Sequence, residues 1–232
     1  MCVRYTLHKS DAAIASISKA LGSHLDNPDW FEPRFNASLT SVMPVVACGP
    51  SGPEVRPMAW GFVAQEGPAG ARPRLLANAR AETVTRMPAF RQAAAARRCL
   101  VPANGFYEWQ ARGRERLPFL FTLRGGEPFA FAGLWEPAGT AGPEAFCILT
   151  TVPNDLMAPI HDRMPVLLGG GALGRWLGDA PLGGAEMAGL TRPLDSARME
   201  CRRVSRFVSN SRHEGPECLG PAEEEPPEFD FG

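Results

Sequence analysis

The sequence lacks any long apolar run, any closely spaced cysteine pair and almost all lysine, and each shortage excludes a class of protein. No stretch approaches the roughly 18 apolar residues of a membrane-spanning helix, and the first residues, MCVRYTLHKSD, have no apolar signal core. We therefore expect a cytoplasmic protein without a membrane partner. The 232 residues are 44% hydrophobic and 21% charged, which is typical of one globular domain with a sizeable core.

The six cysteines form no C-x-x-C pair and do not cluster with histidine at metal-ligand spacing. Without a secretion signal, they indicate reduced and mostly buried thiols rather than a disulfide framework. Their scatter also argues against a zinc site, and we expect no metal and no cofactor. The cysteines are Cys2, Cys48, Cys99, Cys147, Cys201 and Cys218.

Lysine is nearly absent, because Lys9 and Lys19 are the only two among 24 basic residues. Arginine suits planar recognition of phosphates and bases, although a GC-rich genome would produce the same bias. Five acids lie in the final segment AEEEPPEFDFG, and removing them from the formal net charge of −1 leaves +4. We expect a mildly basic domain over residues 1–220 and an acidic, disordered tail over 221–232. Such a domain can carry a basic groove for nucleic acid.

Short β-branched and aromatic runs alternate with turns that contain glycine or proline. Many strands and few, short helices predict an α+β fold, a single domain with a mostly antiparallel, barrel-like β core flanked by short helices. We expect loops at 23–40 and 66–73. We expect helices from Ser10 to Gly22, after Pro88, after Pro153 and at 171–178. We expect strands at 3–8, 42–49, 55–65, 99–109, 117–123, 129–137, 145–151 and 202–210.

Two residues could transfer protons. Glu108 lies in GFYEW, and strand alternation puts it on the face opposite Tyr107 and Trp109. A cavity on that face would raise the carboxyl pKa, although an outward, solvated position is the better interpretation of the strand alone. His161 lies in IHDRMP and has the chemistry of a general acid or base, but a single loop histidine is more often structural.

Other polar and aromatic residues could contact a ligand. Asn78, Arg80 and Glu82 alternate, so in an extended segment they share one side. That side would be either a polar recognition strip or the surface of an edge strand. Trp30 and Trp60 are candidate platforms for unpaired bases, although most tryptophans pack in cores.

Cys2 follows the initiator methionine. Removal of Met1 would leave an amine and a thiol on adjacent carbons of one residue. This 1,2-aminothiol is a chemistry that no internal residue can offer.

The chain resembles the SRAP family, the SOS response-associated peptidases, also described as abasic-site processing proteins. The resemblance covers most of the sequence and is carried by these segments in order: MCVRY, PRFNAS, AWGF, LLANARAET, RCLVPANGFYEW, PFAFAGLWE, ILTTVPNDLMAPIHDRMPVLL and VSNSRHEGPEC. It implies that Cys2 is the nucleophile and that Asn78, Glu108 and His161 complete the catalytic set. It implies DNA-binding roles for Arg4, Asn36, Trp60, Arg80 and Arg163.

The resemblance further implies a monomeric sensor that crosslinks to abasic sites in single-stranded DNA and shields them during repair. The link would be a thiazolidine formed by Cys2, and the bound protein would be associated with the nucleoid. The sequence departs from the family pattern at three places, one of which is the W-G segment at Trp60, which lacks its usual following proline and second tryptophan. Val3 replaces the glycine of M-C-G-R, and residues 37–40 lack the usual proline.

Two other functions fit the same residues. The first is a thiol peptidase, acting on itself or on another peptide, in which Cys2 attacks a carbonyl with His161 as base. The second is a non-catalytic module that binds single-stranded DNA. A denaturing gel separates them, because only a covalent product survives denaturation.

Overall fold

The structure is a computed structural model that describes residues 3–64, 74–139, 142–178 and 180–222. Three sequence predictions lie outside this range. They are the nucleophile Cys2, the loop at 66–73 and, apart from its first two residues, the acidic tail at 221–232.

A closed ring of five strands forms the centre of the fold: β3 (Val42–Gly49), β4 (Gly52–Trp60), β8 (Arg98–Ala103), β11 (Phe129–Glu136) and β12 (Ala145–Thr151). β3 pairs antiparallel with β4 and β8, β8 pairs with β11, and β11 pairs with β12. β12 then runs parallel to β4 and closes the ring. The predicted α+β fold with a mostly antiparallel, barrel-like core is confirmed.

Short strands gather around the end of β12. β7 (Asn78–Arg80) lies parallel to it, and β13 (Met164–Pro165) lies antiparallel to it. β14 (Leu167–Leu168) continues the chain and pairs with β11. A separate hairpin is made by β5 (Phe62–Ala64) and β6 (Arg74–Leu76). Because β7 and β13 share β12, the polar segment that follows β7 and the polar segment that precedes β13 meet at one edge of the ring.

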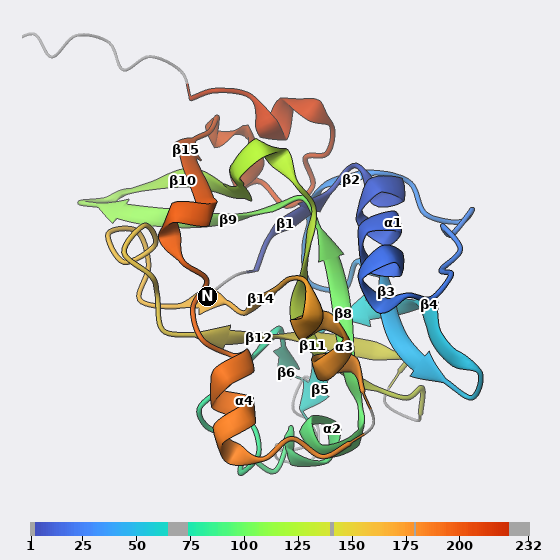
Figure 1. Ribbon diagram of the computed structural model, residues 1–232. Helices are drawn as coiled ribbons and strands as arrows, with labels where there is room; N and C mark the ends of the chain where they lie inside the picture. Colours follow the sequence, from blue (N-terminus) through green and yellow to red (C-terminus); the bar gives the residue numbers. More distant parts are fainter. Residues whose placement is uncertain (1–2, 65–73, 140–141, 179, 223–232) are drawn as a thin grey trace, which may run out of the picture.

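Helices cover the outside of the ring (Figure 1). They are α1 (Ser10–Leu21), α2 (Arg91–Ala96), α3 (Gly171–Leu177) and α4 (Gly184–Leu190). Alternate residues of β12 show how the strand serves both layers, since Phe146 packs inside the ring and Cys147 packs under the helices. α1 ends as predicted at Gly22, whose φ of 63° is a left-handed conformation that glycine adopts without strain.

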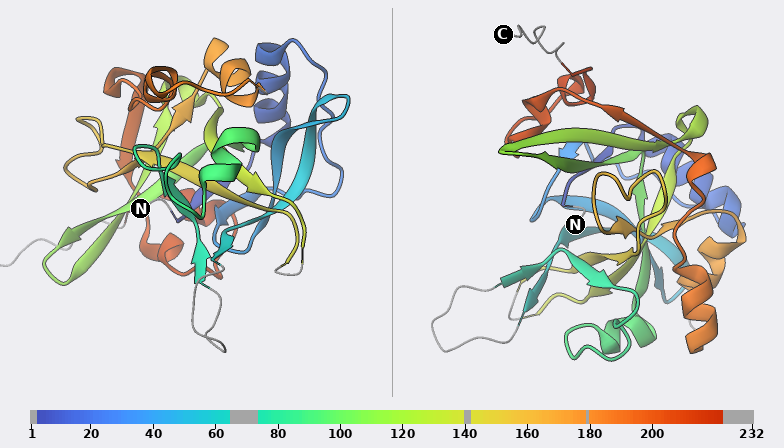
Figure 2. Two further views of the ribbon diagram at one scale, coloured as in Figure 1. Left: turned by 90° about the horizontal axis from the view of Figure 1, so that it is seen from below. Right: turned by 90° about the vertical axis from the view of Figure 1, so that its left-hand side faces the viewer.

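A second, antiparallel sheet packs against the ring in the order β15–β10–β9–β1–β2 (Figures 1 and 2). Its strands are β1 (Tyr5–Leu7), β2 (Arg34–Ala37), β9 (Gly105–Arg112), β10 (Glu115–Leu123) and β15 (Met199–Arg203). One face contributes to the ring core. The other face is covered by residues 204–219, which we call the C-terminal cover. The cover contains two short 3₁₀ helices, η3 (Arg206–Ser209) and η4 (Pro216–Leu219).

Two buried polar side chains tie these layers together. Asn104, 5% exposed, accepts hydrogen bonds at Oδ1 from the backbone N–H groups of His8 (2.9 Å) and Lys9 (2.8 Å), where α1 begins. Arg98, 4% exposed, bonds to backbone carbonyls rather than to a carboxylate. Its acceptors are the oxygens of Ala94, Ala95, Trp176, Gly178 and Ala180.

Six sequence predictions differ from the structure. The strands predicted at 55–65 and 99–109 are each divided between two sheets, because the chain breaks at Gly61 between β4 and β5 and at Asn104 between β8 and β9. Residues 23–40 are not all loop, because Arg34–Ala37 forms β2 by pairing with β1. The segment after Pro153 makes turns rather than a helix, and it leads into β13. The helix after Pro88 begins only at Arg91. The strand predicted at 202–210 ends at Arg203 and gives way to η3. Arg34–Ala37 becomes a strand through long-range pairing with β1, and the neighbouring prolines in the sequence do not predict that pairing.

Candidate active site

Glu108 is the buried acid of the site. It lies on β9 opposite Phe119 of β10, and only 3% of it is exposed. Burial raises the pKa of Glu108 from its ordinary value of 4.5 to about 7, because a charged carboxylate is disfavoured away from water. The solvated position that the strand pattern favoured is therefore wrong, whereas the alternation was correct. Tyr107 contacts the C-terminal cover on the opposite face.

His161 faces this acid, with its Nε2 atom 4.0 Å from Oε2 of Glu108. The ring is held by its own loop, because the backbone N–H of Arg163 donates to Nδ1 over 3.0 Å. A neutral ring in this position carries its proton on Nε2, toward Glu108. Burial lowers the pKa of His161, and the Asp162 carboxylate, 2.9 Å from Nδ1, opposes that shift. Gln110 of β9 donates to the Pro159 carbonyl over 3.0 Å and fastens the loop.

The N-A-R segment alternates as the sequence predicts. Asn78 is half-buried and Arg80 and Glu82 are exposed, whereas Ala79 and Ala81 between them are buried. β7 runs beside β12, with Asn78 opposite Ile148. The three polar residues therefore share one side of the strand and its following turn, at the ring edge that also carries the His161 loop.

Arg163 is already paired with protein groups. Its two terminal nitrogens form a fork with the Glu82 carboxylate, at 2.8 and 2.9 Å, and Nη2 also donates to the Thr150 carbonyl over 2.6 Å. The hydrogen bonds from Arg163 lower the pKa of Glu82. No local pattern in the sequence predicts this pair, or the part played by Thr150, which contributes a backbone oxygen. To make the phosphate contact that the resemblance implies, Arg163 would have to exchange some of these hydrogen bonds for bonds to the phosphate. Arg80 is exposed.

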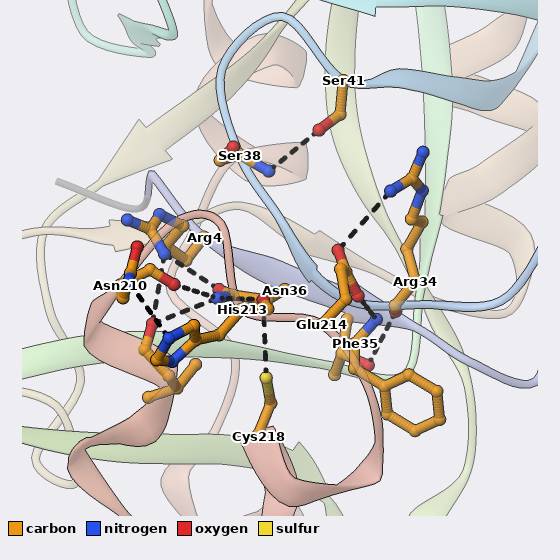
Figure 3. Close-up of polar contacts among 12 residues, drawn as sticks. Arg4, Arg34, Phe35, Asn36, Ser38, Ser41, Asn210, His213, Glu214 and Cys218 are labelled. Atoms are coloured by element: carbon orange, nitrogen blue, oxygen red, sulfur yellow. Dashed lines mark hydrogen bonds and ion pairs between the residues drawn. The ribbon is translucent and has the colours of Figure 1, made fainter.

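Asn36 and Arg4 are engaged with each other and with the C-terminal cover (Figure 3). Asn36 is 1% exposed, and its amide nitrogen donates to the carbonyls of Val208, Asn210 and His213. Its Oδ1 accepts from Arg4. The Asn36 amide is therefore buried and bonded to protein groups in this structure, and its implied DNA-binding role stays a prediction.

Trp60 is also a core residue rather than a base platform. Its ring is fully buried, packs edge-on to Tyr5 and stacks on Phe146. Its Nε1 donates to the Ala77 carbonyl over 3.0 Å. The Trp60 ring is therefore enclosed by protein in this structure, and its implied DNA contact stays a prediction. Trp30, by contrast, is 46% exposed.

The chain leads from the N-terminus directly past Glu108. The Tyr107 N–H donates to the Arg4 carbonyl over 3.0 Å, and Tyr5 is paired with Phe106. Continuing this antiparallel register sets Val3 across from Glu108. Cys2 itself lies outside the described residues.

Three further observations concern metal-binding groups, disulfides and membrane-spanning helices. Within the described ranges, no group of three His, Cys, Asp or Glu side chains is placed to hold a metal ion. The five described cysteines are free thiols, and three of them, Cys99, Cys147 and Cys218, are buried. No helix in the described part of the chain is long and apolar enough to span a bilayer.

Comparisons with known proteins identify a family and a shared fold. A family model described as SOS response associated peptidase (SRAP) matches residues 1–211. The abasic site processing protein YoqW of Bacillus subtilis is 32% identical over 227 residues, covering 94% of this chain and 99% of its own. YoaM, an abasic site processing protein of the same organism, is 33% identical over 226 residues, covering 94% and 97%. A crystal structure of a Bacteroides thetaiotaomicron protein shares the fold, with a TM-score of 0.76 at 23% identity, covering 96% of this chain and 100% of that one.

Proposed function

The chain belongs to the SRAP family, and from this premise we propose that it captures abasic sites in single-stranded DNA through a covalent bond to Cys2. The relatives described above are named for abasic sites, and we extend that substrate to this protein. The product would shield the lesion from strand cleavage during repair.

The reaction uses both nucleophiles of a processed N-terminus. Removal of Met1 frees the amine of Cys2, whose pKa is about 8, so part of it is neutral near pH 7. The amine adds to the aldehyde carbon of the opened deoxyribose, and loss of one water gives an imine. The Cys2 thiolate then adds to the imine carbon while the nitrogen takes a proton. The five-membered thiazolidine forms with the loss of that single water, and its closure is favoured because both groups belong to one residue.

The observation that carries the proposal is the buried Glu108 carboxyl, which faces His161 beside the strand leading from Cys2. Chain connectivity keeps the Cys2 Cα about 3.8 Å from that of Val3, which the register sets across from Glu108. With a pKa of about 7, Glu108 can both donate and accept a proton near neutral pH. We assign it and His161 to the proton transfers of sugar opening, dehydration and ring closure.

DNA would approach along the ring edge that carries Arg80. An exposed guanidinium can hold a phosphate without first losing a protein partner. Phosphate contacts of this kind fix the strand without reading its sequence. Because they are electrostatic, added salt should slow the encounter but leave the covalent product intact.

A thiol peptidase acting on itself is the second candidate. The observation in its favour is His161, whose lowered pKa leaves a neutral base available near Glu108. Removal of Met1 would be the simplest such reaction. This activity would precede the capture of DNA rather than exclude it.

The test is a denaturing gel of the purified protein mixed with single-stranded DNA that carries one abasic site. We expect a covalent band that is absent with intact DNA and lost in Cys2→Ala. Cys48→Ala serves as the matched control, because Cys48 is a partly buried thiol on β3, outside the proposed site, and should keep the band. Mass spectrometry first establishes that Met1 has been removed. A processed protein that gives no band would contradict the proposal, and turnover of added peptides would favour the peptidase.

A further inference from the structure

We propose that Asn36 is a positioning residue, which fastens Arg4 to the C-terminal cover and thereby fixes the direction in which the chain leaves β1 toward Cys2. The proposal rests on the crosslinking function above. It assigns Asn36, Arg4 and the Val208 carbonyl to one clamp, in place of direct contacts between DNA and the first two of these residues.

The Asn36 amide is the centre of this clamp (Figure 3). Its nitrogen donates over 3.1 Å to Val208, 3.0 Å to Asn210 and 3.0 Å to His213, each through the backbone carbonyl. Its oxygen accepts from Nη1 of Arg4 over 3.0 Å. A single buried side chain on β2 therefore bonds to the first strand and to three points of the cover.

Arg4 is held at three places. Nη1 donates to the Val208 carbonyl over 3.1 Å as well as to Asn36. The guanidinium carbon lies 5.9 Å from the centre of the Trp109 ring, within the range of a cation–π contact. The backbone carbonyl of Arg4 accepts from Tyr107. Fixing both the side chain and the carbonyl of one residue restricts its rotation, so the direction of the chain before it is restricted too.

Such restraint is needed because β1 is short. It has three residues, and its pairing with β2 is irregular between Tyr5 and Leu7. A strand of three residues makes few backbone hydrogen bonds with its neighbours. These bonds alone would hold the N-terminal end of the chain weakly, although the proposed reaction requires Cys2 to meet the aldehyde carbon of the sugar. Reaction rates depend steeply on such placement, and a shift of about 1 Å can cost about a hundredfold.

The cover is itself anchored, so it can serve as the fixed side of the clamp. Ser209 Oγ accepts from Trp109 Nε1 over 3.0 Å, and Glu214 accepts from the Phe35 backbone N–H over 2.9 Å. Within the cover, the His213 ring stacks on Phe207 with centroids 4.0 Å apart. These contacts join the cover to β9 and β2, the two strands that flank β1.

The test separates placement of the nucleophile from affinity for DNA. Asn36→Ala removes the centre of the clamp, and Arg4→Met removes the guanidinium while leaving Asn36 and the cover in contact. Two quantities are measured for each variant. One is the first-order crosslinking rate at saturating single-stranded abasic DNA. The other is the equilibrium Kd for the same strand with a tetrahydrofuran abasic analogue, which has no aldehyde.

We expect both variants to lose at least tenfold in rate while Kd changes less than twofold. Asn104→Ala is the matched control, since Asn104 is an equally buried asparagine that bonds to backbone groups but does not touch Arg4. It should lower the Tm comparably and leave the rate within twofold. A weakened Kd with an unchanged rate would show that Arg4 and Asn36 act on DNA. If Asn104→Ala lost as much crosslinking rate as Asn36→Ala, the loss would be explained by lower stability of the fold, and the clamp would be excluded as its cause.

Hydrogen exchange of the N-terminal peptide keeps this proposal distinct from the crosslinking function. The clamp requires faster exchange at residues 4–7 in Asn36→Ala than in Asn104→Ala, whether or not any DNA is bound. If the wild type forms no crosslink but this difference is seen, the crosslinking function fails and the clamp stands. If the two variants exchange alike, the clamp is excluded.

Discussion

The Nε2 atom of His161 lies 4.0 Å from Oε2 of Glu108, and burial moves the pKa values of these two groups in opposite directions. The acid becomes weaker and the base becomes weaker, so near pH 7 the carboxyl is about half protonated and the imidazole is mostly neutral. A pair in this state can pass a proton either way, as the formation and reversal of an imine require. The surroundings of these two side chains thus give them pKa values suited to the proton transfers proposed above.

Replacing Glu108 by glutamine should stabilise the protein at alkaline pH. The folded-state pKa of about 7 lies above the ordinary value of 4.5, so the folded protein binds this proton more tightly. The wild type therefore loses stability as pH rises from about 4.5 to 7, by at most about 3 kcal/mol at about 1.4 kcal/mol per pKa unit. Glu108→Gln removes that loss.

Urea unfolding at pH 5 and pH 8 measures the effect. We expect the gain of Glu108→Gln over the wild type to be larger at pH 8 than at pH 5. Glu200→Gln, an exposed glutamate on β15, is the control and should show no such dependence. An equal gain at both pH values would mean that the Glu108 carboxyl does not titrate in this window.

The Asp162 carboxylate should set the protonation of His161. It raises the pKa of the ring against the lowering effect of burial, so Asp162→Asn should lower the pKa of His161 further. An NMR titration of the ring gives this shift directly, and the ¹⁵N shifts at high pH should show the proton on Nε2. The acid limb of the crosslinking rate should move to lower pH in the same variant. A proton found on Nδ1 would contradict the proposed geometry.

The Glu82 carboxylate should compete with DNA for Arg163. Breaking their ion pair through Glu82→Gln frees the guanidinium, and a partly exposed pair is worth about 0.2–1 kcal/mol. We expect Kd for single-stranded DNA to tighten by up to about fivefold at low salt and less at high salt. Fluorescence anisotropy measures Kd. The control is Glu186→Gln, which breaks a remote pair with Arg175. Weaker binding in Glu82→Gln would instead show that Glu82 holds Arg163 in its binding position.

Removing the buried Arg98 guanidinium should destabilise the fold without touching the proposed site. Arg98→Met leaves backbone carbonyls near the ends of α2 and α3 without their donor, and we expect a loss of roughly 3 kcal/mol. Thermal unfolding measures it, with exposed Arg91→Met as the control. At a temperature where Arg98→Met remains folded, its crosslinking rate should match the wild type. A Tm close to that of the wild type would show that water replaces the guanidinium.

The sequence predicts the ring well because its strands carry strong local patterns. Residues 145–149 are all apolar, as is typical of a strand buried on both faces, and β12 contains them together with Thr150 and Thr151. β2 could not be predicted, since Arg34–Ala37 becomes a strand only through its partner β1. The turns after Pro153 were mistaken for a helix because proline opens either structure.

The site was predicted in part, and the limits have physical causes. Alternation placed Glu108 on the correct face, but burial of that face depends on the ring beneath it. The resemblance to the SRAP family implies roles for Asn36 and Trp60, but a family pattern does not show whether a side chain is exposed or, as these two are, buried. The pairing of Glu82 with Arg163 joins residues 81 positions apart, and no local pattern carries such information.

The C-terminal cover has a consequence for the order of synthesis. Val208 and His213 bond to the clamp that holds Arg4, yet the ribosome makes them about 200 residues later. In a nascent chain, Cys2 is among the first residues to emerge, and the contacts that hold Arg4 are completed only when the cover has been made. The nucleophile would therefore be directed at its target only in a finished molecule, so an incomplete chain would have little capacity to crosslink DNA.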